Sequence, residues 1–571
     1  MPKIDVNENL FFSLLGEKPS YDKLEILLQS AKAELDELPT EATGDERILK
    51  IELNDTNRPD LWSTAGVARA LRTYRTKEIT DYRKLFSGDC GNRVVKVASD
   101  VKKVRPFMTA FVVSGKPIDD AMLKDIIQTQ EKLCWNFGRK RQSVSMGVYR
   151  SEKIHWPVHY TACDPDKTSF VPLATDTKMT CRQIITEHPK GKEFGWILKD
   201  AEVFPILKDD KGEILSMAPI INSADLGAVQ VGDADLMIEF TGCDLPSILL
   251  ATQILACDFI DAGYKILPIK MEYEFDTEFG KDFACPIYFQ KPISADVEFC
   301  HKLLGENLSN EEIEEALLRM GIVATISDGK ITCEIPPYRN DFLHPADVAE
   351  DVMIGRGLSS FSKEKPRDFT IGRLLPITEL SRKTKMLLVG QGYQEMIFNY
   401  LGSKLNFIDK MNFDGSTVIE ISNPMTENYQ FVRPSVLPSL LGAESTSANA
   451  VYPHKIFEIG KVAYICDEEN TGCRTRQVLG MLSASAEDNF NTMASEVASL
   501  LFYLGFEYAV EASSDSRFIP GRQVKVLAKK GDKQVVAGIF GEIHPAVLEN
   551  WQITMPCVAA ELDLEELLSA M

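Results

Sequence analysis

Residues 335–357 read IPPYRNDFLHPADVAEDVMIGRG and place four carboxylates directly behind a Pro-Pro pair. Pro345 suits the first turn of a helix, and Gly355 and Gly357 suit its end. The stretch therefore predicts a helix that starts near Pro345. Three acids of this helix would share one face and repel one another, namely Asp347, Glu350 and Asp351. Either a cation or plain solvent has to relieve that repulsion.

A related pattern occurs earlier in the chain, at NRPDLWSTAGVARALR, residues 57–72. In both places a helical stretch and a strand come first: 21–38 and RILKIEL in the first, SNEEIEEALLRM and KITCEI in the second. We infer a duplicated supersecondary unit. Its shared residues are Arg58, Asp60, Ala65, Val67 and Ala68 in the first copy and Arg339, Asp341, Ala346, Val348 and Ala349 in the second. The three helical acids are specific to the second copy, because Gly66, Arg69 and Ala70 replace them in the first.

The bulk composition is that of a folded protein with several domains. With 571 residues the chain is too long for one core, and its length suggests about three to five domains. Hydrophobic residues make up 44% and charged residues 26%, which argues against disorder, collagen and coiled coils. A net charge of −21 argues against general adhesion to nucleic acid, so any RNA contact has to be local or shared with a partner.

Targeting and metal signals are weak. The start, MPKIDVNENL, lacks a signal pattern, and the longest apolar run, 245–260, is short and interrupted by Thr252 and Gln253, so we expect no membrane association. The twelve cysteines form no CxxC pair and fit free thiols in a reducing compartment, so we expect a cytoplasmic protein. Pro157 lies between His155 and His159 and disfavours a helical zinc pair.

The stretch 204–242 is a second candidate site. Its pattern predicts two strands joined by a polar loop, with Ser216 and Asn222 placed around the apolar turn of SMAPIIN. Glu239 lies between Ile238 and Phe240 and is either on a solvent face or buried with a partner. An ordinary sheet with polar edges explains the same pattern. Farther on, SKEKPRD at 362–368 has the composition of a charged linker, and the remainder mixes helices and strands as an α+β domain does.

Seven strings of the chain resemble, in the expected order, the beta subunit of phenylalanyl-tRNA synthetase in the shorter form typical of archaea and eukaryotes. They are NRPDLWSTAGVARALR, GRKRQSVSMGVY, SMAPIINS, PPYRNDFLHPADVAEDV, VRPSVLPSLL, FEIGKV and FGEIHPAVLENW. The resemblance spans nearly the whole chain.

The resemblance implies an α+β multidomain fold. Its parts would be a first copy of the duplicated unit at 1–88, an α/β editing domain at 89–275, the second copy at 288–363, and a class II synthetase-like antiparallel-sheet domain without catalytic motifs at 366–571. It also implies an alpha subunit that charges tRNA for phenylalanine with ATP and Mg²⁺, in a tetramer of two alpha and two beta subunits. A free-standing trans-editing hydrolase and a non-enzymatic scaffold are the alternatives.

The resemblance also implies site residues, none of them catalytic for aminoacylation. The editing residues, which would hydrolyse mischarged Tyr-tRNA, are Leu207, Ser216, Asn222 and Glu239. A magnesium site is implied at Asp341, Asp347, Glu350 and Asp351, where the alternative is a solvated helix face. The densest basic run near the editing stretch is a candidate for contact with the tRNA backbone or a solvated surface: Arg139, Lys140 and Arg141.

Overall fold

The computed structural model describes residues 3–37, 47–55, 57–367, 369–447 and 449–571. The chain divides into two compact units, Met1–Glu364 and Lys365–Met571, and the division falls within the charged stretch 362–368. Among the described residues, no helix is long and apolar enough to cross a membrane. The two units are described separately below.

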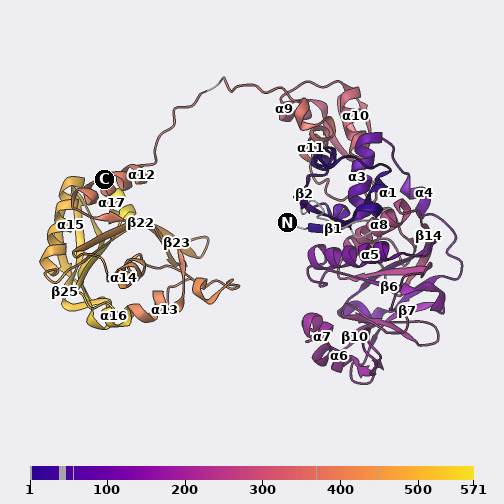
Figure 1. Ribbon diagram of the computed structural model, residues 1–571, viewed down its shortest axis with the longest axis horizontal. Coiled ribbons are helices and arrows are strands. Elements are labelled where there is room, and N and C mark those ends of the chain that lie inside the picture. The colour runs from indigo at the N-terminus through magenta and orange to yellow at the C-terminus, as the bar shows by residue number, and fades with distance from the viewer. Residues whose placement is uncertain (1–2, 38–46, 56, 368, 448) are drawn as a thin grey trace. The chain divides into compact units, whose positions relative to one another are not determined.

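Two small segments of the first unit share one topology, which agrees with the inferred duplication (Figure 1). The first contains β1 (Lys3–Asn7), α1 (Glu8–Leu15), α2 (Tyr21–Leu28), β2 (Ala33–Glu37), β3 (Ile48–Leu53) and α3 (Thr64–Thr76). The second contains β16 (Ile293–Asp296), α9 (Val297–Leu304), α10 (Asn310–Arg319), β17 (Val323–Ser327), β18 (Lys330–Glu334) and α11 (Pro345–Arg356). In each segment the third strand lies between the other two, antiparallel to both.

The helix expected over 21–38 is wrong in its second half. Helix α2 ends at Leu28, a short 3₁₀ turn follows, and Lys32 adopts a left-handed backbone with φ of 51°. The next residues form β2, in which Leu35 pairs with Ile51 of β3. Pairing with a neighbouring strand therefore overrides the helical spacing of the leucines. Residue 38 lies outside the described residues. By contrast, the helix predicted at Pro345 is confirmed as α11.

A ten-stranded sheet forms the middle of the first unit. Nine of its strands run in the order β12-β11-β10-β7-β4-β14-β5-β13-β6, and β15 (Asp282–Cys285) pairs with β14. Their bounds are β4 Val94–Val97, β5 Phe107–Ser114, β6 Val144–Arg150, β7 Val158–Cys163, β10 Phe204–Lys208, β11 Ile214–Met217, β12 Ile221–Asn222, β13 Leu236–Gly242 and β14 Lys265–Tyr273. Helices α6 (Cys181–Glu187) and α7 (Pro189–Phe194) lie near β10 (Figure 1).

Helix α8 (Leu245–Asp261) is the long apolar run of the sequence, and it packs on β5 and β13. Its polar residues are satisfied inside the protein. Thr252 shares a hydrogen bond of 2.7 Å with Thr109, and Gln253 donates to the Ile287 carbonyl. At its far end, Asp258 and Asp261 each lie within 3 Å of the Arg69 guanidinium, at 2.9 and 2.8 Å. Arg69 stands in the first copy where Glu350 stands in the second. It thus anchors α3 to α8, the helix that packs on the sheet.

The second unit is a seven-stranded sheet in the order β19-β22-β23-β27-β26-β25-β24. Its strands are β19 Gln394–Glu395, β22 His454–Ile465, β23 Cys473–Ala484, β24 Glu507–Ala512, β25 Phe518–Lys530, β26 Lys533–Ile543 and β27 Cys557–Asp563. One core joins the sheet to α12 (Pro376–Gly390), α15 (Phe490–Leu504) and α17 (Leu564–Ser569). Another joins it to α14 (Leu437–Thr446) and α16 (Pro545–Asn550). The α+β organisation expected for this part is confirmed.

Candidate functional site

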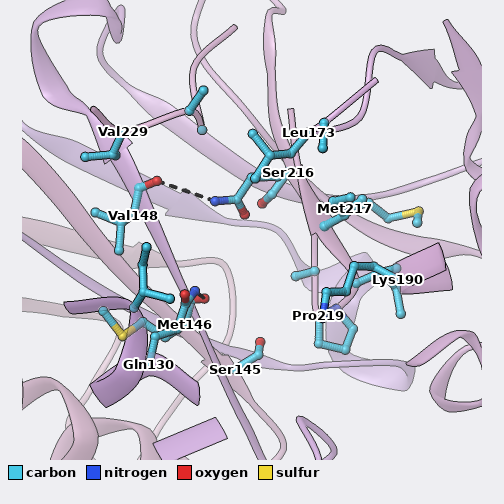
Figure 2. A pocket seen from close by; sticks show the side chains of 18 of the residues that line it. Gln130, Ser145, Met146, Val148, Leu173, Lys190, Ser216, Met217, Pro219 and Val229 are labelled. Carbon is cyan, nitrogen blue, oxygen red and sulfur yellow. Dashed lines mark hydrogen bonds between the residues drawn. The ribbon is translucent and has the colours of Figure 1, made fainter. Parts of the chain in front are cut away.

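A cavity of about 700 Å³ opens in the ten-stranded sheet domain. Its walls come from α5 (Asp120–Lys132), β6, the β11–β12 hairpin, β13 and the residues that begin α7. In Figure 2, Ser216, Met217 and Pro219 lie on one side of the cavity. Gln130, Met146 and Val148 lie on the other side. Most of these walls are apolar, so the few polar groups among them determine what the cavity can bind.

The β11–β12 hairpin places two of the predicted editing residues opposite each other. Ser216 and Asn222 are register partners, and the apolar turn between them is closed by a hydrogen bond of 2.8 Å from the Ile220 N–H to the Met217 carbonyl. Both side chains belong to the cavity lining. Leu207 lies on β10 as the register partner of Ser216 and is buried. It is not among the lining residues, so the structure places it behind Ser216.

Glu239 is buried in β13 and lines the cavity, with 3% of its surface exposed. Its carboxylate oxygen Oε1 accepts a hydrogen bond of 3.1 Å from the Tyr149 hydroxyl. Its other oxygen, Oε2, has no hydrogen-bond partner among the described residues, and the same holds for Ser216 Oγ. Of the two possibilities for this residue, burial with a partner is the one observed. Two buried oxygens are therefore left for a ligand or water.

Burial sets the protonation of Glu239. It raises the pKa of Glu239 to about 7, while the Tyr149 hydrogen bond and the charge of Arg105 oppose that rise. Arg105 is itself buried and donates to Thr241 and Ser145. Near neutral pH the carboxyl group therefore exists in both forms. It can accept a hydrogen bond from a hydroxyl group in the cavity or donate one to it.

The cavity lining lacks a protein nucleophile with an adjacent base. Its described residues include neither cysteine nor aspartate. The lining histidine, His188, uses its Nδ1 to accept the backbone N–H of Lys190 at 3.1 Å, as a cap of α7. No Ser-His-Asp arrangement is present among these residues. In a hydrolysis in this cavity, water therefore has to attack the substrate directly, without a covalent intermediate on the protein.

The four acids of the predicted magnesium site all have partners within the protein. Arg339 contacts both carboxylate oxygens of Asp341, at 3.0 and 2.6 Å. It also contacts both oxygens of Asp351, at 2.5 and 3.2 Å. Burial alone would raise the pKa of Asp341, yet the guanidinium groups of Arg339 and Arg58 hold it well below its ordinary value. In Asp351 burial prevails, and its pKa is raised.

The other two acids have separate partners. Glu350 lies 2.5 Å from the ammonium group of Lys32 in the first copy. Asp347 accepts the backbone N–H groups of Leu343 and His344, at 2.7 and 2.6 Å, and so caps α11. Within the described ranges, no three His, Cys, Asp or Glu side chains are grouped to hold a metal ion. In this arrangement the four acids do not fit a magnesium site, and the geometry favours a structural role.

Comparison with known proteins gives consistent matches along the chain. Residues 1–77 match the Phe-tRNA synthetase beta subunit B1 domain, residues 293–358 the tRNA synthetase B5 domain, and residues 364–564 the phenylalanyl tRNA synthetase beta chain CLM domain. The phenylalanine–tRNA ligase beta subunit of Treponema pallidum is 45% identical, with all of both chains covered. The chain belongs to the family of phenylalanine–tRNA ligase beta subunits.

Two further comparisons support membership of this family. The protein of that name from Borrelia recurrentis is 43% identical over the full length of both chains. An N-terminal fragment of the phenylalanyl-tRNA synthetase beta subunit from Pyrococcus horikoshii is 32% identical, with a TM-score of 0.58, and covers 62% of this chain and 100% of the fragment. The two full-length relatives are bacterial, so they establish the family and not the archaeal or eukaryotic subtype expected from the sequence.

The basic run of this beta-subunit chain is split by the structure. Arg139, Lys140 and Arg141 all have a left-handed backbone, with φ of 49°, 54° and 69°. Arg139 and Lys140 are exposed, whereas Arg141 is half-buried and lines the cavity. Its guanidinium donates to the carbonyl groups of Pro219 and Ile220, at 3.2 and 2.9 Å, and lies over the Phe194 ring. Arg141 thus braces the β11–β12 turn, and two cations are left for other contacts.

Sequence reasoning missed two residues that contact or pair with Glu239 of the cavity lining, Tyr149 and Gly147. They lie in the string GRKRQSVSMGVY, which carried part of the family resemblance. Tyr149 is fully buried and bonded to Glu239. Gly147 is the direct register partner of Glu239 across the β6–β13 pair. A tyrosine and a glycine two positions apart in an apolar strand gave no signal on their own, because their importance depends on the strand that pairs with them.

Proposed function

We propose that this chain is the beta subunit that supports a catalytic alpha subunit in charging tRNA with phenylalanine, and that it hydrolyses mischarged Tyr-tRNA in the cavity of the ten-stranded sheet domain. Full-length identity of 45% and 43% to two phenylalanine–tRNA ligase beta subunits supports the first part. ATP and Mg²⁺ then belong to the charging reaction of the complex. The proposed assembly contains two alpha and two beta subunits, and the proposed architecture is the short form of the subunit.

The observation that carries the editing part is the pair of buried oxygens without partners, Glu239 Oε2 and Ser216 Oγ, in an otherwise mostly apolar cavity. A charging site for phenylalanine rejects the added hydroxyl of tyrosine by only about a hundredfold, so tyrosine has to be removed afterwards. In the cavity, the tyrosine hydroxyl would find Glu239 Oε2. Phenylalanine would leave that oxygen unpaired, at a cost of about 1–3 kcal/mol.

Water is the proposed nucleophile for the ester bond of Tyr-tRNA. The cavity holds the aminoacyl group, the hairpin oxygen of Ser216 is available to orient the ester or the water, and the terminal hydroxyl of the tRNA assists. A positioned water needs no activated side chain, because orientation alone supplies a large part of such a rate enhancement. Arg139 and Lys140 are the proposed contacts to the tRNA backbone.

The second unit favours a subunit over a free-standing hydrolase or a scaffold with a dead cavity. It matches the CLM domain of the family over residues 364–564, and an editing enzyme that acts alone would not require it. Its arginine in the string VRPSVLP, Arg433, is fully buried and makes two bonds of 2.9 Å to Glu458, so it is committed to the fold. The proposed role of this unit is assembly with the alpha subunit.

Deacylation of preformed Tyr-tRNA and Phe-tRNA by the complex tests the proposal. Wild type is expected to hydrolyse Tyr-tRNA much faster than Phe-tRNA. Glu239→Ala is expected to lower this selectivity about ten- to a hundredfold, which corresponds to about 1.5–3 kcal/mol for one buried charged hydrogen bond. Charging with phenylalanine stays normal in that variant. Glu202→Ala, at an exposed position of the same domain, is the matched control. Equal selectivity of wild type and Glu239→Ala would mean that a residue other than Glu239 recognises the tyrosine hydroxyl.

A further inference from the structure

Tyr149 makes the contact that orients the Glu239 carboxyl group. Its ring is fully buried in β6, and its hydroxyl lies 3.1 Å from Glu239 Oε1 and 3.3 Å from Asn222 Oδ1. The Asn222 amide in turn donates to the Val148 carbonyl at 3.4 Å (Figure 2). Three polar side chains from β6, β12 and β13 therefore meet, and two of them, Asn222 and Glu239, line the cavity.

The backbone leaves room for this contact at one position. Gly147 is the register partner of Glu239. A Cβ atom at Gly147 would lie 2.4 Å from the Tyr149 hydroxyl oxygen and 2.6 Å from Glu239 Oε1. Any other residue at 147 would therefore displace the hydroxyl, the carboxyl group or both. The paired strands β6 and β13 therefore accommodate the contact between Tyr149 and Glu239 because residue 147 has no side chain.

The protonation of Glu239 sets the arrangements open to this network. When Glu239 is ionised, Tyr149 donates its proton to Oε1. When Glu239 is protonated on Oε1, the carboxylic acid donates to the Tyr149 oxygen, and Tyr149 donates to Asn222 Oδ1. When the proton lies on Oε2, Tyr149 still donates to Oε1, and Oε2 becomes a donor. In every arrangement Oε1 stays bound to Tyr149 and Oε2 is the oxygen left for a bound hydroxyl group, always as an acceptor when ionised and as an acceptor or a donor when protonated.

We propose that Tyr149 is a positioning residue for the selection of tyrosine: by holding Oε1 of Glu239, it keeps Oε2 directed at the hydroxyl of a tyrosyl group in the cavity. This inference rests on the proposed editing function. Without Tyr149 the carboxyl group can rotate about its last side-chain bond, and both oxygens lose their fixed direction. Selection then falls, although every group that touches the substrate is still present.

Tyr149→Phe removes only the hydroxyl and keeps the ring that fills the core. In the complex, this variant is expected to lose about tenfold in the ratio of Tyr-tRNA to Phe-tRNA deacylation, the effect of one hydrogen bond to a buried charged group. The hydrogen bond from Tyr149 lowers the pKa of Glu239, so its loss raises that pKa further. The pH profile of Tyr-tRNA deacylation is therefore expected to shift to higher pH, which a merely structural role would not produce.

A double variant shows whether Tyr149 acts through Glu239. In a Glu239→Ala background, Tyr149→Phe should change selectivity far less than in wild type. Thermal unfolding of each variant identifies any loss that comes from folding. Additive effects of the two changes, or unchanged selectivity and pH profile in Tyr149→Phe alongside active wild type, would overturn the positioning role and leave the editing function standing. A wild-type complex that does not hydrolyse Tyr-tRNA would overturn both.

Discussion

Arg339 and Asp351 form a buried ion pair in which two guanidinium nitrogens lie 2.5 and 3.2 Å from the carboxylate oxygens. The same guanidinium binds Asp341, so one cation holds two of the acids of the stretch 335–357. The repulsion expected along this stretch is relieved from within the chain. In the first copy, Arg58 and Asp60 make the corresponding contact, with nitrogen and oxygen 2.8 Å apart.

Asp351→Asn should destabilise the first unit by about 3–5 kcal/mol, because it leaves Arg339 buried with only Asp341 as a charged partner. Glu350→Gln is the matched control. Its ion pair with Lys32 is partly exposed, and its loss should cost less than about 1 kcal/mol. Denaturant unfolding of the full chain, with added Mg²⁺ and with a chelator, measures both. Stabilisation of wild type by Mg²⁺ that disappears in Asp351→Asn would restore the metal interpretation.

The stability of the first unit should fall as pH rises from about 4.5 to about 7, because the pKa of buried Glu239 is raised from 4.5 to about 7 on folding. In this window the folded state holds a proton that the unfolded state has released, so a higher pH favours unfolding. Asp258, whose pKa is raised by burial to about 7, adds the same slope. Glu239→Gln should flatten the dependence in part. Melting temperatures at several pH values measure it, and identical slopes in both proteins would contradict the assigned burial.

Gly147→Ala should lower both editing and stability. The added methyl group would lie within 2.6 Å of the two oxygens that form the Tyr149–Glu239 hydrogen bond, so that bond has to lengthen or break. Gly88→Ala is a suitable control, because its Cβ would meet Pro268 at an ordinary 3.4 Å. Tyr-tRNA deacylation and thermal unfolding of the two variants measure the difference. Normal editing in Gly147→Ala would show that the strands adapt more easily than their packing indicates.

Loss of Arg139 and Lys140 should affect tRNA binding, whereas loss of Arg141 should also affect thermal stability. The double variant Arg139→Ala, Lys140→Ala removes two exposed cations and should weaken tRNA binding most at low salt, with a smaller salt dependence than wild type. Arg141→Ala frees the Pro219 and Ile220 carbonyl groups and should also lower thermal stability. Lys533→Ala, in the second unit, is a control for general charge. Unchanged salt dependence in the double variant would assign these residues to a solvated surface.

The chain without an alpha subunit should not activate phenylalanine. Arg433 is bonded to Glu458 and to the Lys461 carbonyl and lies over the Tyr400 ring, so it is not available to a nucleotide. Phenylalanine-dependent pyrophosphate exchange measures activation, with the complete complex as the positive control. Exchange by the isolated chain would contradict the assignment of phenylalanine activation to the alpha subunit.

The sequence predicts local features well where residues close together in the chain determine them. The start of α11 at Pro345 and the turn between Ser216 and Asn222 follow from proline geometry and an apolar turn, whereas the pattern around Glu239 leaves its burial open. Helix 21–38 was mispredicted because its second half pairs with β3, a contact that local spacing does not contain. The partner strand, and not the local sequence, determines the structure there.

The candidate site was predicted less completely, for a related reason. Ser216, Asn222 and Glu239 are neighbours in the sequence stretch 204–242, and they do meet at the cavity. Tyr149 comes from a strand far away in the chain, and only the pairing of β6 with β13 brings it to Glu239. The sequence leaves open whether the acids behind the Pro-Pro pair hold a metal ion or face solvent. One cationic partner, Lys32 of the first copy, lies hundreds of positions earlier, and the contacts of Arg339 within the stretch depend on how that stretch folds.

Two ion pairs join the first copy of the duplicated unit to the second. Lys32 and Arg58 of the first copy lie 2.5 and 3.9 Å from Glu350 and Asp341 of the second. Each pair takes its cation from the first copy and its acid from the second, so two first copies could not form them. Since both copies belong to one chain, the matching partner is always present at high effective concentration. This tether disfavours the exchange of units between neighbouring chains, although an exchanged first copy would meet the same acids in its neighbour.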